Sequence, residues 1–141
     1  MEGNVKLLLR SRSKVDEVED ELLFDGTGTV ERTAYGWRIT YDAAERESGQ
    51  RVRSRVQLEQ DGPRARLQND GAGYTLCLDP AQDAELIIPT PQGDLRLQVQ
   101  ARQVFWALEE DGCGSVALSY SLLAGGQPVS CLQVQLDMTQ E

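Results

Sequence analysis

The sequence contains no histidine among its 141 residues. It therefore lacks the side chain that most often acts as a general base and as a transition-metal ligand, and it lacks every Ser-His-Asp and Cys-His arrangement. Tyrosine, arginine, lysine and carboxylate side chains remain as candidates for acid-base chemistry. We favour a protein that is not an enzyme, and we expect neither a metal site nor a cofactor.

Cysteine is rare, and its three positions, Cys77, Cys113 and Cys131, include no C-x-x-C spacing. An odd number of widely spaced cysteines suits reduced thiols in a cytoplasm better than a disulfide framework or a zinc site. We expect Cys77 and Cys131, which lie within strand patterns, to be buried and inert. Cys113 lies in a turn, so we expect it to be exposed.

Long apolar runs are also missing. No stretch approaches the roughly 18 consecutive apolar residues of a membrane-spanning helix. The first residues, MEGNVKLLLRSR, show neither the apolar stretch nor the small-residue cleavage site of a secretory signal. The sequence therefore predicts a cytoplasmic protein that does not associate with a membrane.

Positive charge is scarce, because 23 acidic residues face 14 basic ones and the formal net charge is −9. Such a surface repels phosphate backbones, so we expect no nucleic-acid partner. Acidic residues cluster at 16–21 and at 109–111, and Ca²⁺ binds several oxygen ligands. Neither cluster has the spacing of a calcium loop, and we interpret both as solvated surface.

Turn residues and period-two alternation dominate the rest of the chain. Short groups of turn residues divide the chain into extended segments, such as Asp25-Gly26, Ser48-Gly49, Asn69-Asp70-Gly71 and Gly125-Gly126. Within these segments apolar residues alternate with polar ones, which indicates half-buried antiparallel strands. The clearest alternations are Trp37-Ile39-Tyr41, Val52-Val56-Leu58, Tyr74-Leu76-Leu78, Val116-Leu118-Tyr120-Leu122 and Leu132-Val134-Leu136-Met138.

This pattern predicts an all-β protein of roughly eight to ten strands with at most one short helix. A sandwich and a closed barrel both bury one face of a large antiparallel sheet, and closure also removes exposed edges. The length and the lack of a linker or repeat indicate a single domain over 1–141, with its core at about 4–138.

The segment 15–23 is ambiguous. Val15, Val18 and Leu22 fit helical spacing, and Ser13 with Asp16 would form a capping box. The same acidic run also fits a solvated turn that leads into a strand near 22–30. We favour the turn.

The segment LRLQVQ, residues 95–100, alternates strictly. We predict that Leu95, Leu97 and Val99 point inward. Arg96, Gln98 and Gln100 should then meet the solvent.

Arginine accounts for twelve of the fourteen basic residues, and Arg51, Arg53 and Arg55 share one face of a predicted strand. Arginine binds carboxylate or phosphate through two parallel hydrogen bonds, so this face is a candidate anion site. The alternative is an outer face on which arginines pair with acidic residues across strands and keep the sheet solvated. We favour the alternative.

Two further patterns have a structural explanation that we prefer. Residues 112–117, GCGSVA, match the G-x-G-x-x-A dinucleotide fingerprint, but the next residues alternate as a strand where the fingerprint requires a helix. A glycine-rich hairpin is the better interpretation.

Glu59 and Asp79, at strand ends, are the best candidates for a catalytic carboxylate pair, although surface placement is favoured.

Several segments resemble the YwiB-like family. They are Trp37–Asp42, Pro89–Gly93 followed by alternating apolar residues, the hairpin at 112–122 and the final strand at 131–138. The sequence departs from the family at 66–71, RLQNDG, where members show an Arg-x-Gly turn. The resemblance implies a calycin-type, lipocalin-like antiparallel barrel in a bacterial cytoplasm, with ligand binding suggested by analogy to other calycins.

Three hypotheses about function follow, in order of preference. The first is a barrel that binds a small amphipathic or anionic ligand at its mouth. The second is an interaction module or homodimer that uses the outer sheet surface or an edge strand. The third is an enzyme that relies on Tyr41, Arg53 and Glu59. The candidate ligand-binding residues are Arg38, Tyr41, Arg53, Tyr74, Trp106 and Tyr120.

Overall fold

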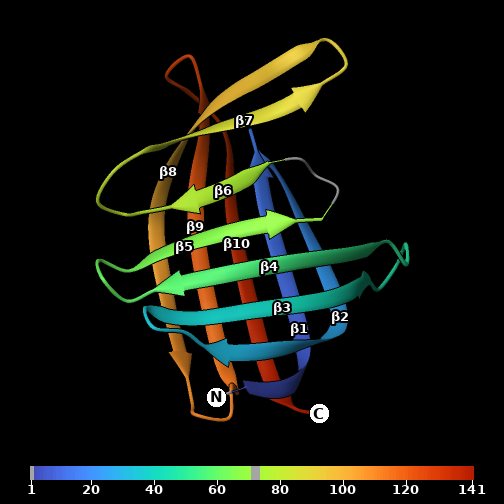
Figure 1. Cartoon of the computed structure of the whole chain (residues 1–141). Coiled ribbons are helices and arrows are strands. Elements are labelled where there is room, and N and C mark those ends of the chain that lie inside the picture. The colour runs from blue at the N-terminus through green and yellow to red at the C-terminus, as the bar shows by residue number, and fades with distance from the viewer. Residues whose placement is uncertain (1, 71–73) are drawn as a thin grey trace.

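The computed structural model describes residues 2–70 and 74–141, and Gly71 of the expected turn at 69–71 lies outside them. Within these ranges no helix is long and apolar enough to cross a membrane. The described residues form ten strands (Figure 1): β1 (Glu2–Val15), β2 (Val18–Arg32), β3 (Gly36–Glu45), β4 (Arg51–Glu59), β5 (Arg64–Asn69), β6 (Thr75–Leu78), β7 (Ala84–Thr90), β8 (Gly93–Leu108), β9 (Gly114–Ala124) and β10 (Gln127–Gln140).

All ten strands belong to one antiparallel sheet with the order β6-β5-β4-β3-β2-β1-β10-β9-β8-β7. The sheet curls into two layers, and β3 to β6 cross in front of the more upright β1, β10, β9 and β8 (Figure 1). The result is a nearly closed barrel, which confirms the predicted all-β, calycin-like fold. The sheet stays open between its two end strands, β6 and β7.

Two glycines lie where β2 pairs with β1 on one side and with β3 on the other. A Cβ atom at Gly26 would overlap the backbone oxygen of Asp42 and come within 2.7 Å of the Ala43 Cβ. A Cβ atom at Gly28 would come within 2.6 Å of the Thr40 backbone oxygen. Glycine therefore permits the close approach of β3 at the bend where one layer turns into the other.

The ambiguous segment forms a tight hairpin between β1 and β2. Val15 pairs with Val18, and Asp16 takes the left-handed conformation with φ of 55°. The predicted turn is confirmed. The strand that follows begins at Val18, four residues before the predicted start at Leu22. The acidic run lies along this strand because its cross-strand neighbours include Arg12 and Lys14.

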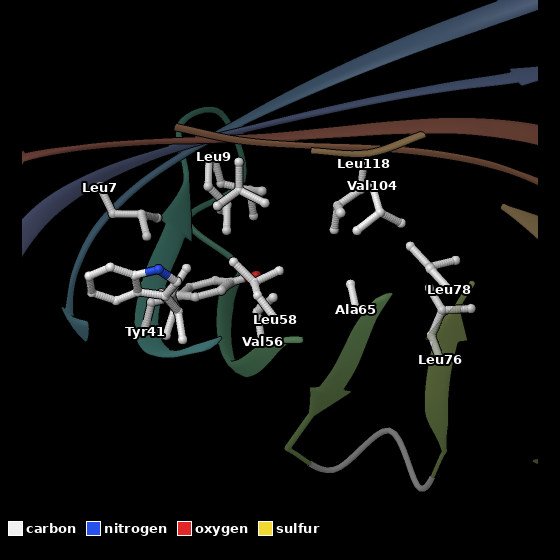
Figure 2. Packing of buried hydrophobic residues seen from close by; sticks show 14 of the residues in the cluster. Leu7, Leu9, Tyr41, Val56, Leu58, Ala65, Leu76, Leu78, Val104 and Leu118 are labelled. Carbon is white, nitrogen blue, oxygen red and sulfur yellow. The ribbon is translucent and has the colours of Figure 1, made fainter. Parts of the chain in front are cut away.

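The core lies between the two layers, and alternation along each strand supplies it. In β3, for example, Trp37, Ile39, Tyr41 and Ala43 are all buried. Figure 2 shows side chains of the two layers facing one another. Leu7, Leu9, Val104 and Leu118 come from the upright layer, and Tyr41, Val56, Leu58, Ala65, Leu76 and Leu78 come from the crossing layer.

The first half of β8 follows the predicted alternation at Leu97 and Val99, which are buried. The prediction is wrong for Leu95, which is 46% exposed. Leu95 has the inward phase, opposite Ile88, but the tip of the β7-β8 hairpin projects beyond the other strands (Figure 1). A register shift between Ala101 and Gln103 then reverses the phase of the strand.

The prediction of burial is wrong for Cys77 and Cys131, which are exposed. Each occupies an outward position between two inward residues, Leu76 and Leu78 in the case of Cys77. Cys113 is half-buried in the turn between β8 and β9. The strand β9 follows that turn directly, which confirms the glycine-rich hairpin over the dinucleotide fingerprint.

Candidate ligand-binding cavity

Core side chains leave a cavity of about 210 Å³ between the layers, and its lining includes the exposed residues Leu22 and Asn69, so it is open to the solvent. An apolar cavity of about 150 Å³ is large enough for a benzene molecule, so this cavity has room for slightly more than one aromatic ring. Strands of both layers contribute to its wall. The lining residues are Leu9, Ser11, Leu22, Phe24, Tyr41, Val52, Leu67, Asn69, Tyr74, Leu76, Tyr120 and Val134.

Three of the six predicted site residues, Tyr41, Tyr74 and Tyr120, meet at this cavity. Burial raises the pKa of Tyr120 to about 12, and nearby Tyr74 adds to the rise. Burial also raises the pKa of Tyr41, although a hydrogen bond with Ser54 opposes the rise. The hydroxyl groups of Tyr41 and Tyr120 are therefore neutral at physiological pH and able to donate or accept hydrogen bonds.

A row of paired polar residues crosses three strands, and its two end members, Tyr41 and Asn69, line the cavity. Tyr41 on β3 pairs with Ser54 on β4, and Ser54 pairs with Asn69 on β5. The buried Ser54 hydroxyl donates a hydrogen bond to Asn69 Oδ1. Sequence reasoning missed both residues, although Ser54 lies between the inward positions Val52 and Val56. A polar residue at an inward position of a strand is the sequence signal that would have identified Ser54.

A surface groove of about 740 Å³ adjoins the cavity, because Asn69 and Tyr74 line both. Side chains of β4 and β5, among them the outward Arg53, Arg55 and Gln68, border the groove on one side, and Glu85 and Ile87 of β7 border it on the other. Its lining residues are Thr40, Arg53, Ser54, Arg55, Gln68, Asn69, Asp70, Tyr74, Thr75, Glu85 and Ile87. We call this surface the β6-β7 groove, after the two end strands of the sheet that flank it.

The two arginines of the β6-β7 groove differ in their partners. Arg53 Nη2 lies 3.4 Å from Asp42 Oδ2, and Arg51 Nη2 lies 3.0 Å from the other oxygen of the same carboxylate. Arg55 has no carboxylate oxygen within 4 Å among the described residues. Arg55 is therefore the cation of the groove whose charge is not already balanced.

The other predicted site residues lie elsewhere. Arg38 is on the outer face of β3, where its Nη1 atom lies 2.7 Å from Glu31 Oε1. Trp106 is half-buried on β8 opposite Val116. Neither residue lines the cavity or the β6-β7 groove.

The residues named for an enzymatic mechanism do not converge. Tyr41 is buried in the interior, whereas Arg53 is exposed on the outer face. Glu59 lies at the far end of β4, where its Oε2 atom is 2.8 Å from Arg64 Nη2. The Asp79 carboxylate accepts a hydrogen bond from the backbone N–H of Ala81. Among the described residues no group of three or more Cys, Asp and Glu side chains is arranged to hold a metal ion.

These features define a small antiparallel β-barrel with a tyrosine-lined interior cavity beside an arginine-bearing groove. A family model described as "Domain of unknown function (DUF1934)" matches residues 8–136, and the chain belongs to this family. The fold is similar to the crystal structure of the ywiB protein from Bacillus subtilis. That comparison has a TM-score of 0.75 and 15% identity, and it covers 99% of this chain and 94% of that chain. The curated proteins contain no match.

Proposed function

We propose that this protein binds a small amphipathic carboxylate. The apolar part of the ligand lies in the tyrosine-lined cavity, and its carboxylate lies in the β6-β7 groove at Arg55. The observation that carries this proposal is that the cavity and the groove share Asn69 and Tyr74. A ligand at their junction reaches an apolar wall and an unbalanced cation at the same time.

The cavity volume limits the ligand. Sites for drug-sized molecules measure roughly 300–1,000 Å³, so the 210 Å³ cavity is too small for such a molecule. It suits one aromatic ring or a short acyl chain. The sequence suggested an amphipathic or anionic ligand. The size of the cavity narrows that suggestion to aromatic carboxylates and short-chain fatty acids.

The polar groups at the junction of the cavity and the groove would orient the bound ligand. Arg55 offers a planar guanidinium that binds a carboxylate through two parallel hydrogen bonds. The neutral hydroxyls of Tyr41 and Tyr120 offer hydrogen bonds to a polar substituent on the ring or chain. The three cysteines are free thiols, which supports a reducing compartment such as the cytoplasm for this binding.

The experiment is a thermal-unfolding screen with benzoate, substituted benzoates, and fatty acids of about four to eight carbons. A ligand at a hundredfold excess over its Kd adds about 2.7 kcal/mol of stability, which raises the Tm by about 5–10 °C in a domain of this size. Isothermal titration calorimetry then measures the Kd of each compound that raises the Tm.

Three variants test the placement of the ligand. Ser11→Leu fills the cavity and should abolish binding. Arg55→Gln removes the Arg55 guanidinium and should weaken binding of the carboxylate by about tenfold or more, the loss expected for one charged hydrogen-bonding partner. Arg64→Gln is the matched control, because Arg64 is an arginine of the same layer outside the groove. The proposal fails if no compound raises the Tm, or if Ser11→Leu and Arg55→Gln bind as the unmodified protein does.

A further inference from the structure

The geometry points to a second activity for the β6-β7 groove: we propose that the free edge of β7 binds an extended peptide segment of a partner protein as an added β-strand. This inference does not depend on the small-molecule proposal, because it rests on backbone groups of β7. Among the described residues, β7 pairs with β8 alone and β6 pairs with β5 alone. An unpaired edge presents a row of N–H and C=O groups that another chain is able to pair with.

The direction of these backbone groups follows from the β7-β8 turn. Thr90 pairs with Gly93 across the two-residue loop 91–92, so these residues form the hydrogen-bonded pair that closes the hairpin. Hydrogen-bonded and non-hydrogen-bonded pairs alternate along an antiparallel ladder. The backbone groups of Ala84, Leu86, Ile88 and Thr90 therefore face β8.

The alternate residues, Glu85, Ile87 and Pro89, direct their backbone groups away from β8. Proline has no N–H and is tolerated in a sheet where that group would face away from the ladder, which agrees with its place at position 89. Glu85 and Ile87 thus present complete N–H and C=O pairs at the open edge. The same two residues line the β6-β7 groove, and the Ile87 side chain is 38% exposed.

The shape of the β6-β7 groove favours a single strand over a second copy of the chain. Residues of β4 and β5, together with Tyr74 and Thr75, bound the groove on the side opposite β7. A strand that pairs with Glu85 and Ile87 would lie between β7 and this opposite wall, and a single extended segment brings less bulk into that space than the edge of a second ten-stranded sheet.

The groove carries two carboxylates, Asp70 and Glu85, beside its two arginines, so charge complementarity to an acidic residue is local to Arg55. Arg55 has no acidic partner within 4 Å among the residues described, so a carboxylate side chain on the peptide would find its cation there. The exposed Ile87 side chain suits an apolar or β-branched neighbour. We therefore assign the groove to an extended segment of alternating β-branched and polar residues that includes an Asp or Glu. Because Arg55 serves both ligands, the peptide and the small carboxylate should exclude one another.

The test starts from a displayed library of random peptides of about eight residues, which slightly exceeds the length of β7. The library is selected on the full chain and counter-selected on Ile87→Pro. Proline at 87 removes an edge N–H and leaves the β8 ladder intact, and Ile87→Val is the matched control that keeps the N–H. The selected peptide is then synthesised with a fluorescent label, and its anisotropy gives the Kd for each variant.

The selected peptides should be rich in β-branched residues and should carry an Asp or Glu at the position that reaches Arg55. Their affinity should fall by about tenfold or more in Ile87→Pro, should fall in Arg55→Gln, and should stay within about twofold in Ile87→Val. Glu85→Pro serves as a second edge variant if Ile87→Pro does not fold, as judged by circular dichroism. The proposal is overturned if no peptide is enriched, or if the enriched peptides bind the folded edge variants equally well. It is also overturned if sedimentation equilibrium shows a dimer that these variants dissociate, because the edge would then belong to a second copy.

Discussion

Tyr74 and Tyr120 line the same cavity, where burial, and after it the neighbouring Tyr74, raise the pKa of the Tyr120 hydroxyl to about 12. The unfolded chain releases this proton near pH 10, whereas the folded chain retains it up to about pH 12. A pKa raised by folding contributes full stability below pH 10 and loses it as the pH rises toward the folded value. We predict that the free energy of unfolding falls by about 2 kcal/mol between pH 9.5 and 11.5 because of Tyr120 alone.

Urea unfolding at the two pH values measures this fall. Tyr120→Phe removes the titrating group and should reduce the fall by about 2 kcal/mol. Tyr35→Phe is the control, since Tyr35 is 76% exposed and should not change the slope. An equal fall in Tyr120→Phe and in the unmodified protein would show that the Tyr120 pKa is not raised by folding.

The bend in β2 gives a second prediction. Gly26→Ala forces a methyl group against the backbone of Asp42 and Ala43, which has little freedom to move. We expect a loss of about 2–3 kcal/mol in the free energy of unfolding, the upper range for overpacked sites. Thr27→Ala, at the exposed neighbouring position, should cost no more than about 1 kcal/mol. Denaturant unfolding compares the two, and similar losses would contradict the close contact.

Alternation predicted the strands and most of the interior because burial of one sheet face repeats every two residues and is a local property. The inward places of Ile39, Leu97 and Leu118 follow from it directly. Phe105 is 54% exposed because the register shift at 101–103 reverses the phase of β8. No residue type in that segment indicates a register shift, so only the pairing of the strands in the structure reveals where the shift lies.

The candidate site was harder to predict, since it depends on which strands meet across the barrel. The sequence placed Tyr41, Tyr74 and Tyr120 among the ligand-binding residues, but it gave no indication that they share one cavity. Arg55 is a candidate ligand-binding residue because, among the described residues, no carboxylate lies opposite it on a neighbouring strand. Which residues lie opposite one another depends on the register of the strands, and the sequence does not show that register. The free edge of β7 likewise follows from the strand order.

The hydrogen bond from Ser54 to Asn69 gives a third prediction. Ser54→Ala removes the donor from a buried site, and we expect a loss of about 1 kcal/mol in stability. A double-mutant cycle with Asn69→Ala isolates the pair, and the two losses should be less than additive by about 0.5–1 kcal/mol. Strict additivity in urea unfolding would mean that the two side chains act independently.

The three thiols should differ in reactivity. Cys77 and Cys131 are exposed, whereas Cys113 is half-buried beside Asp111. Burial, followed by the neighbouring Asp111 and Glu109 carboxylates, raises the pKa of the Cys113 thiol. A raised pKa leaves less of the reactive thiolate at pH 8, so we expect Cys113 to react with a disulfide reagent several times more slowly than Cys77.

Variants that each retain one cysteine, with the other two replaced by serine, allow the rates to be measured separately by absorbance. Asp111→Asn removes a charge that raises the Cys113 pKa and keeps an acceptor for the backbone N–H of Cys113, so the reaction should accelerate. Glu110→Gln removes a neighbouring charge that is not one of the two that raise the Cys113 pKa, so the rate should stay unchanged. If Cys113 reacts as fast as Cys77, the thiol is not shielded in the β8-β9 turn.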